Sequence, residues 1–325
     1  ALYLFLLQKR EENELSQAFT AYNTRIVAPP HGSMLPMSPV RKNILMVACA
    51  LGLLIPVVII FICENMNTRV RGRKDLESVT VPFIGEIPLF TRKKKGIFRK
   101  KPQEVRAIVV KEGSRDIINE AFRVLRTNLE FMTGKDKASN VIIVTSFNPG
   151  SGKSFLTMNI AVSFAIKGKK VLVIDGDLRH GSASSYIDSP TKGLSDYLGG
   201  RIDNLNEIIV TNPKQKYLDI LPVGTIPPNP TELLFDDRLK QVIDTVREQY
   251  EYVLIDCPPI ELVADTQIIE KLADRTIFVV RAGLLELSML AELEKIYGEK
   301  KYKNMSLILN GTEGSGGRYG YRYGY

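Results

Sequence analysis

The 325-residue sequence contains no tryptophan, two histidines and three cysteines. Two of the cysteines, Cys49 and Cys63, lie inside one apolar run, and Cys257 follows another. This spacing provides neither the clustered ligands of a zinc site nor the framework of a disulfide-rich domain. The pattern predicts a reduced, cytosolic main domain. The sequence also has no initiating methionine, and we expect it to be the C-terminal part of a longer protein.

The excess of basic over acidic residues is concentrated in one segment. The formal net charge is +8 at pH 7, and residues 69–106 hold twelve Lys and Arg against four Asp and Glu, an excess that equals the whole net charge. The rest of the chain is neutral, so a broadly basic surface for nucleic acid is not indicated. We therefore expect no nucleic-acid partner.

A run without any charge covers residues 44–63, ILMVACALGLLIPVVIIFIC. Roughly 20 residues at about 1.5 Å each span the ~30 Å of a bilayer core. A buried core helix is the alternative, and it is disfavoured because such helices seldom lack a polar face over five turns. The run predicts a transmembrane helix.

Basic residues indicate which side of this helix is cytoplasmic. Four of them lie between residues 69 and 74, against Arg41 and Lys42 before the run. The positive-inside rule then places residues 1–43 outside and the C-terminal side in the cytoplasm. We expect residues 64–106 to form a basic juxtamembrane linker. Its clusters at 92–95 and 99–101 either lie along anionic membrane lipid or remain solvated.

After residue 107, short β-branched runs alternate with helical stretches. This alternation is typical of an α/β fold with a mostly parallel, doubly wound sheet and helices on both faces. The predicted strands are 141–146, 171–175, 218–222, 252–256, 276–281 and 305–309. We expect one such domain over 107–312. Residues 313–325 are rich in Gly without apolar periodicity, and they predict a flexible tail.

The run FNPGSGKS lies between the first predicted strand and a predicted helix, which is the context of a phosphate-binding loop. Backbone N–H groups around Gly150 and Gly152 can close on phosphate oxygens. Lys153 offsets their charge, and the Ser154 hydroxyl suits Mg²⁺. The first glycine of the usual GxxxxGK[ST] pattern is Phe147 here. A chance glycine-rich turn is the alternative, which the agreement of strand, loop and helix disfavours.

Carboxylates follow two further predicted strands. Asp175 and Asp177 close the run VLVIDGD, and Asp256 closes YVLID before a Cys-Pro-Pro sequence. Ligands of parallel sheets bind at the carboxyl ends of the strands, where such carboxylates can reach a metal ion and a substrate hydroxyl. An ordinary Asp-Gly-Asp turn and an ordinary strand cap are the alternatives.

These motifs, in this order, resemble those of a known family. VTSFNPGSGKS, VLVIDGDLR and YVLIDCPP are similar to the Walker A, A′ and B motifs of the bacterial tyrosine kinases, the BY-kinase family. EAFRVLRTN at 120–128 resembles the family's self-association helix, PPNPTELL at 227–234 its PPNPxELL segment, and FIGEIP at 83–88 its juxtamembrane segment. The N-terminal residues are similar to the end of a Wzz-like polysaccharide co-polymerase domain.

The resemblance implies a P-loop fold and an ATP-dependent protein-tyrosine autokinase that uses Mg²⁺. It implies nucleotide contacts for residues of the loop: Gly150, Ser151, Gly152, Lys153, Ser154 and Phe155. It implies Mg²⁺ contacts for Ser154, Asp177 and Asp256. The implied catalytic set is Lys153, Asp175, Asp177 and Asp256, with Asp175 as the base toward the tyrosine hydroxyl.

Three charged residues of the self-association motif, Glu120, Arg123 and Arg126, are spaced at i, i+3 and i+6 and share roughly one helical face. The spacing by itself is typical of a solvated face. The resemblance implies instead an intersubunit contact in a ring-like homo-oligomer.

The tail carries alternating tyrosines, separated by Gly or Arg, that cannot bury in a shared core. They are Tyr319, Tyr321, Tyr323 and Tyr325. We expect them to be phosphoacceptors that enter the site of a neighbouring subunit. A sticky low-complexity end is the alternative.

The resemblance also implies a biological setting. It implies regulation of capsular or exopolysaccharide polymerisation and export at the bacterial inner membrane, with the kinase domain in the cytoplasm. The implied partners are membrane lipid, the polysaccharide machinery and a tyrosine phosphatase.

Two other functions remain open from the sequence. One is a structural co-polymerase that only binds ATP, and the other is a ParA/MinD-like ATPase. The latter places a lysine five residues before the phosphate-binding lysine, where this sequence has Asn148, and this difference favours the kinase.

Overall fold

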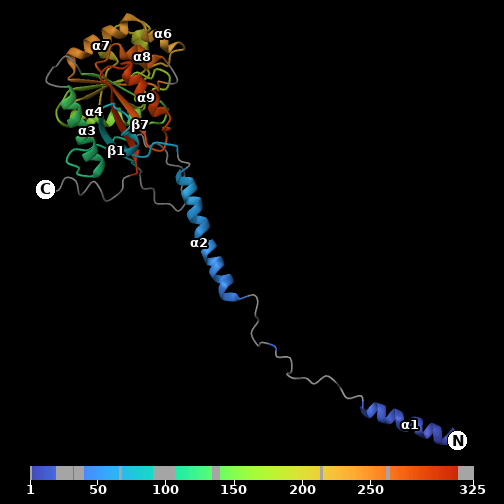
Figure 1. Cartoon of the computed structure of the whole chain (residues 1–325). Helices are drawn as coiled ribbons and strands as arrows, with labels where there is room; N and C mark the ends of the chain where they lie inside the picture. Colours follow the sequence, from blue (N-terminus) through green and yellow to red (C-terminus); the bar gives the residue numbers. More distant parts are fainter. Residues whose placement is uncertain are drawn as a thin grey trace, which may run out of the picture. The chain divides into compact units, whose positions relative to one another are not determined.

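The computed structural model describes residues 2–19, 32, 40–65, 68–90, 107–133, 140–212, 215–260 and 264–313 (Figure 1). The chain divides into two compact units, Ala1–Asn67 and Thr68–Tyr325. The first unit contains helices α1 (Leu2–Phe19) and α2 (Arg41–Asn65). The second contains a sheet and its covering helices.

Helix α2 includes the predicted membrane span. Its candidate segment, Arg41–Ile62, has a mean hydropathy of 3.0 and none of its apolar window is buried against protein. By length and composition this helix is able to cross a membrane. That α1 ends an extracytoplasmic domain stays a prediction.

The sheet of the second unit has eight strands in the order β1-β8-β7-β2-β6-β3-β5-β4. All neighbouring pairs are parallel except β4 with β5. The strands are β1 (Phe83–Pro88), β2 (Val141–Thr145), β3 (Val171–Asp175), β4 (Val210–Thr211), β5 (Leu218–Leu221), β6 (Tyr252–Asp256), β7 (Arg275–Arg281) and β8 (Ser306–Thr312). The predicted α/β fold with a mostly parallel, doubly wound sheet is confirmed, and each of the six predicted strands is present.

Helices cover both faces of this sheet. The helices of the unit are α3 (Ile117–Thr133), α4 (Lys153–Ile166), α5 (Leu194–Leu198), α6 (Pro230–Leu234), α7 (Asp237–Gln249), α8 (Asp265–Glu270) and α9 (Met289–Gly298). Figure 1 shows α3 and α4 on one side of the strands and α7, α8 and α9 on the other.

Successive side chains of each strand point to opposite faces of the sheet and pack into two separate hydrophobic cores. In β2, Val141 and Ile143 pack with α7 and α9, whereas Ile142 and Val144 pack with α3 and α4. Every side chain of β2, β3 and β6 is buried, as expected for central parallel strands covered on both faces. The loops at the carboxyl ends of these strands are therefore built on a rigid base.

The predicted linker over 64–106 is wrong for residues 68–90, which are part of the folded unit. Val70 is fully buried, and its backbone exchanges 2.8 Å hydrogen bonds with Leu285 and Gly283. Farther along, the Thr80 backbone N–H donates to Glu294 of α9, and β1 pairs with β8. The basic clusters at 92–95 and 99–101 lie outside the described residues.

Strand β1 is held from one side by α3. Asn128 of α3 donates a 2.8 Å hydrogen bond to the carbonyl of Ile84. A side chain at Gly85 would meet the Leu125 side chain at 3.0 Å, so glycine allows the strand and the helix to approach closely. Leu125 itself is fully buried.

We predict that Leu125→Ala lowers the free energy of unfolding by about 2–5 kcal/mol, because it opens a cavity between α3 and β1. Val124→Ala is the matched control, since Val124 is 49% exposed on the same helix. Denaturant titration of the full chain in detergent, with amide hydrogen exchange at residues 84–87, measures both variants. Equal destabilisation by the two substitutions would contradict this packing.

Candidate functional site

The loop between β2 and α4 has the backbone conformation of a closed anion cradle. Gly150 and Gly152 have φ angles of 74° and 88°, which residues with a side chain rarely adopt. A Cβ atom at Gly152 would also collide with Nδ2 of Asn310. Glycine is therefore required at 152 by conformation and by space.

Asn310, near the end of β8, holds this loop. Its Nδ2 donates a 2.8 Å hydrogen bond to the carbonyl of Ser151, and its side chain is 1% exposed. Within the loop, the hydroxyls of Ser146 and Ser151 both donate to the carbonyl of Asn148 at 2.8 Å. These bonds fix the loop before any ligand binds. The sequence reasoning missed Asn310, whose only signal is an amide following the apolar run LIL.

Helix α4 begins directly after the loop, with Gly152 as its N-cap and Lys153 as its first residue. The unpaired N–H groups and the positive dipole of a helix N-terminus favour an anion there. Lys153 and Ser154 therefore lie where the sequence predicted them. Phe155 differs in one respect, because its ring packs against Phe122 of α3 at 6.0 Å and serves the core. Only the backbone N–H of Phe155 could then contact a phosphate at the loop.

Two carboxylates, Asp175 and Asp256, lie side by side at the carboxyl ends of β3 and β6, where they are register partners. Their exposed fractions are 0% and 1%. Burial raises the pKa of Asp256 to about 8, and the neighbouring Asp175 adds to the rise, while Ser154 and Lys153 oppose it. Burial likewise raises the pKa of Asp175 to about 6, against hydrogen bonds from Ser184 that lower it.

The hydrogen bonding of this pair is incomplete. Oδ2 of Asp175 accepts 2.6 Å bonds from the backbone N–H and the hydroxyl of Ser184. Oδ1 of Asp175 and both carboxylate oxygens of Asp256 are buried without a hydrogen bond of ordinary geometry to any described residue. Buried acceptors in this state are costly unless a cation or a donor reaches them.

These acceptors fit a magnesium ion bound together with a nucleotide. Among the residues that the structure describes, no three His, Cys, Asp or Glu side chains are grouped so as to hold a metal by themselves. Mg²⁺ does not need such a cage, because it is commonly bound by one or two carboxylates together with phosphate oxygens and water. The unsatisfied oxygens of Asp256 beside the phosphate loop meet that requirement.

Asp177 lies at the same edge but is engaged differently. It is 7% exposed, and its Oδ1 accepts 3.2 Å bonds from the backbone N–H groups of Arg179 and His180. The His180 ring also approaches it, with Nδ1 3.2 Å from both carboxylate oxygens. The turn lies at 178–180, after the Asp-Gly-Asp run, and the hydrogen bonds to its backbone hold the Asp177 carboxylate in place.

An ion pair that the sequence reasoning missed, between an exposed arginine and a buried carboxylate, connects this turn to two other segments. The Arg179 guanidinium binds the fully buried Asp265 carboxylate of α8 at 3.1 Å and the Thr231 hydroxyl of α6 at 3.0 Å. Thr231 in turn donates to Asp265 at 2.6 Å. Thr231 belongs to the PPNPTELL run, so that run is tied to the wall of the site. Because Thr231 lies far from Arg179 in the sequence, no sequence pattern indicated this contact.

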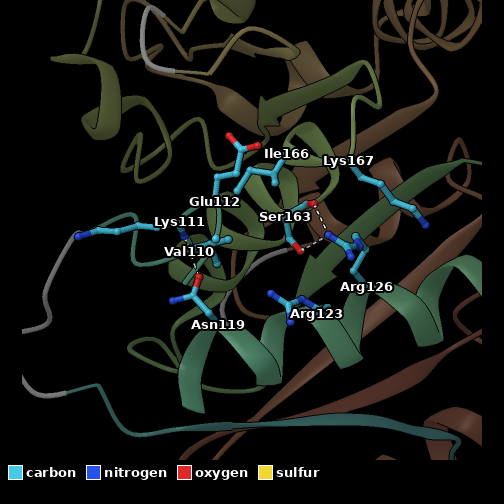
Figure 2. Close-up of a pocket in the computed structure, with 10 residues that line it drawn as sticks. Val110, Lys111, Glu112, Asn119, Arg123, Arg126, Ser163, Ile166 and Lys167 are labelled. Atoms are coloured by element: carbon cyan, nitrogen blue, oxygen red, sulfur yellow. Dashed lines mark hydrogen bonds between the residues drawn. The ribbon is translucent and has the colours of Figure 1, made fainter. Parts of the chain in front are cut away.

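The three residues of the self-association motif do not act alike. Arg123 pairs with Glu120 at 2.5 Å on the exposed surface of α3. Arg126 instead turns toward α4 and donates to the carbonyl of Ser163 at 2.8 Å (Figure 2). An intersubunit role for this face stays a prediction. The tyrosines at 319–325 lie outside the described residues.

Comparison with known proteins identifies the family. The model of a family described as "AAA domain" matches residues 139–307. The tyrosine-protein kinase Etk of Escherichia coli K12 is 31% identical over 87% of this chain, and the tyrosine-protein kinase Wzc of Salmonella typhimurium is 30% identical over 95%. The chain spans 40% and 43% of the lengths of these two curated relatives.

Solved structures agree in fold. The kinase domain of the Escherichia coli tyrosine kinase ETK has a TM-score of 0.65 and 30% identity, covering 79% of this chain and 100% of that domain. The BceF tyrosine kinase domain has a TM-score of 0.62 and 30% identity, covering 75% of this chain and 99% of that domain. The phosphate loop, the buried carboxylate pair and these likenesses together show that the chain belongs to the AAA domain family and, within it, to the bacterial tyrosine kinases.

Proposed function

We propose that the chain is an ATP-dependent protein-tyrosine kinase that phosphorylates tyrosines of its own tail in another copy. The observation that carries this proposal is the position of Asp175 and Asp256. They lie buried and incompletely hydrogen-bonded at the strand edge next to the phosphate loop. The likeness to kinase domains supports phosphoryl transfer over ATP binding alone.

The loop and the start of α4 bind the nucleotide in this proposal. Backbone N–H groups from Gly150 to Phe155 receive the phosphates, and the Lys153 ammonium offsets the charge on the transferring phosphoryl group. Ser154, Asp177 and Asp256 hold Mg²⁺, which neutralises charge on the phosphate oxygens. The preformed loop holds the phosphates at fixed donors, so little reorganisation is needed.

Asp175 is the proposed proton acceptor. Burial raises the pKa of Asp175 above that of an ordinary carboxylate, which makes it a stronger base, and Oδ1 is the oxygen that Ser184 does not occupy. The tyrosine oxygen forms a bond to the γ-phosphorus as the bond from that phosphorus to the β–γ bridging oxygen breaks. The phenolic proton passes to Asp175 and ADP leaves.

The substrates in this proposal are Tyr319, Tyr321, Tyr323 and Tyr325, which are separated by Gly or Arg. The chain would act as a homo-oligomer, using the face of α3 with Glu120, Arg123 and Arg126, so that one copy's tail enters the site of another. We further propose that α2 anchors it in the bacterial inner membrane with the kinase domain in the cytoplasm. A tyrosine phosphatase and the machinery of polysaccharide polymerisation and export are its proposed partners.

The first prediction for this site is that Lys153→Met abolishes phosphotyrosine in the tail without unfolding the protein, because a charge at the phosphates is lost while the loop's own hydrogen bonds remain. The matched control is Lys240→Met, on the exposed surface of α7. Each full chain is incubated in detergent with ATP and Mg²⁺, and phosphotyrosine is located by mass spectrometry. Undiminished phosphorylation in the Lys153 variant would overturn the assignment of the site. Nucleotide binding without any phosphotyrosine in the unaltered chain would favour the structural co-polymerase.

The second prediction concerns Asp256→Asn, which we expect to stabilise the ligand-free protein. The pKa of Asp256 is raised from 3.8 to about 8 in the folded state. The folded protein thus binds more protons than the unfolded chain, and its stability falls as pH rises through that window. The gain from the substitution should be about 2–4 kcal/mol at pH 8 and should shrink toward pH 4.

Calorimetry at the two pH values measures this difference, and Asp219→Asn serves as a control carboxylate in the sheet, hydrogen-bonded to the Tyr250 hydroxyl. We also expect Asp256→Asn to lose the added thermal stability that ATP with Mg²⁺ gives the unaltered chain. If ATP with Mg²⁺ stabilises the variant as much as the unaltered protein, Asp256 does not contact the bound metal.

A further inference from the structure

A pocket of about 230 Å³ lies between α3, α4 and the segment at 110–113, apart from the phosphate loop (Figure 2). Four basic side chains line it against one acidic side chain, Glu112. The basic residues are Lys111, Arg123, Arg126 and Lys167. This composition favours an anionic ligand.

One arginine donor at this pocket, on Arg126, has no partner among the described residues. In Figure 2 the side chains of Arg123 and Arg126 lie next to each other, with Ser163 of α4 facing Arg126. Arg126 donates through one terminal nitrogen to the carbonyl and the hydroxyl of Ser163. Its Nε is buried without a hydrogen-bond partner in the part of the chain that the structure describes. A guanidinium in this state can still bind an oxyanion through its fork of donors.

Glu120 competes with a ligand for Arg123, but the ion pair between the two residues is exposed. Glu120 and Arg123 pair with 46% and 47% of their side chains exposed. Water screens an exposed pair, so its exchange for a doubly charged ligand costs little. The exposed Lys167 is paired with the partly buried Glu130, and in Figure 2 Lys111 and Lys167 lie at opposite sides of the pocket.

The pocket also offers apolar surface beside the arginines. Val110 and Ile166 line it. A phosphate ester on an aromatic ring would place its ring on these side chains and its oxygens on the guanidinium groups. Inorganic phosphate or an aliphatic phosphate ester would use only the charged part.

We propose that this pocket binds phosphotyrosine of the chain's own tail, presented by a second copy or by the same one. The inference rests on the proposed kinase function, which supplies the phosphotyrosine. The side chains of the tail carry a negative charge that could bind the basic pocket only after phosphorylation. Residues 314–325 carry Arg318 and Arg322 and no acidic side chain, so the unmodified tail is repelled by a basic pocket. One phosphate adds about −1.5 to −2 charge and so offsets the two arginines, and each further phosphate makes the tail anionic.

In this pocket the phosphorylated tail would bind away from the carboxylates of the kinase site. This binding also places the tail on the same arginines for which the self-association role is proposed. Phosphotyrosine binding and contact between subunits through this face therefore exclude each other.

The test uses a synthetic peptide with the sequence of residues 314–325 and phosphotyrosine at 321, titrated into the full chain in neutral detergent by fluorescence anisotropy. We expect binding in the presence of saturating ADP, which separates this pocket from the phosphate loop. The unphosphorylated peptide should bind at least tenfold more weakly. Inorganic phosphate should compete only at much higher concentration, and equal competition would reduce the pocket to a general anion site and overturn the proposal.

Variants of the pocket give opposite expected effects. Arg126→Gln should weaken binding at least tenfold, and Arg126→Lys should recover only part of it because the planar fork is lost. Glu120→Gln should tighten binding severalfold by removing the competitor of Arg123, a gain that misfolding cannot produce. Lys240→Gln with Lys295→Gln, on α7 and α9, removes two exposed charges elsewhere and should leave binding unchanged.

Because the peptide is made already phosphorylated, the result does not depend on kinase activity. Peptide binding that Arg126→Gln and Glu120→Gln leave unaltered would overturn the proposal while leaving the proposed kinase untouched. Binding of phosphatidylserine vesicles, but not of the peptide, through Arg126 would overturn it in favour of a membrane contact.

Discussion

The repulsion between two buried carboxylates is the constraint on which this site depends. Parallel strands end at one edge of the sheet, and the register of β3 with β6 places Asp175 beside Asp256 with almost no exposure to water. Two ionised carboxylates at this distance repel each other and lower the stability of the fold. A proton or a cation bound between them relieves that repulsion. The adjacent loop offers the complementary feature, a cradle of backbone donors for phosphate. In the proposed function, a nucleotide bound together with Mg²⁺ would meet both requirements at once.

The rigidity of the phosphate loop comes from parts of the chain far away in sequence. Asn310 of β8 holds the Ser151 carbonyl, and the Arg281 guanidinium lies close to the backbone of both Gly152 and Gly311. The residues that follow Arg281 carry the hydrogen bonds to Val70. A continuous set of contacts therefore runs from the segment after the apolar helix, through the end of β7, to the phosphate loop. This connection is why residues 68–90 belong to the kinase fold and are not a linker.

Sequence patterns were sufficient to predict the features that depend on residues close together in the chain. The β-branched runs at β2, β3 and β6 predicted central strands, and each was followed by its phosphate-binding or acidic residues, so the layout of the site could be inferred. Strand β1 was missed as a strand because Gly85 and Pro88 weaken its pattern, and its stability comes from β8 and from Leu125. The Arg179–Asp265–Thr231 contacts and the inward turn of Arg126 could not be inferred either, since they join residues that only the folded sheet brings together.

In the proposed function, the site of one copy phosphorylates the tail of another, and an experiment that mixes two full chains tests this transfer. One chain keeps its site but has Phe in place of the four tail tyrosines, and the other carries Lys153→Met and an intact, isotope-labelled tail. After incubation with ATP and Mg²⁺ in detergent, mass spectrometry shows which chain carries phosphate. We expect phosphotyrosine within residues 319–325 of the labelled chain, which is unable to transfer phosphate itself. A labelled tail without phosphate, under conditions in which the unaltered protein phosphorylates its own, would contradict it.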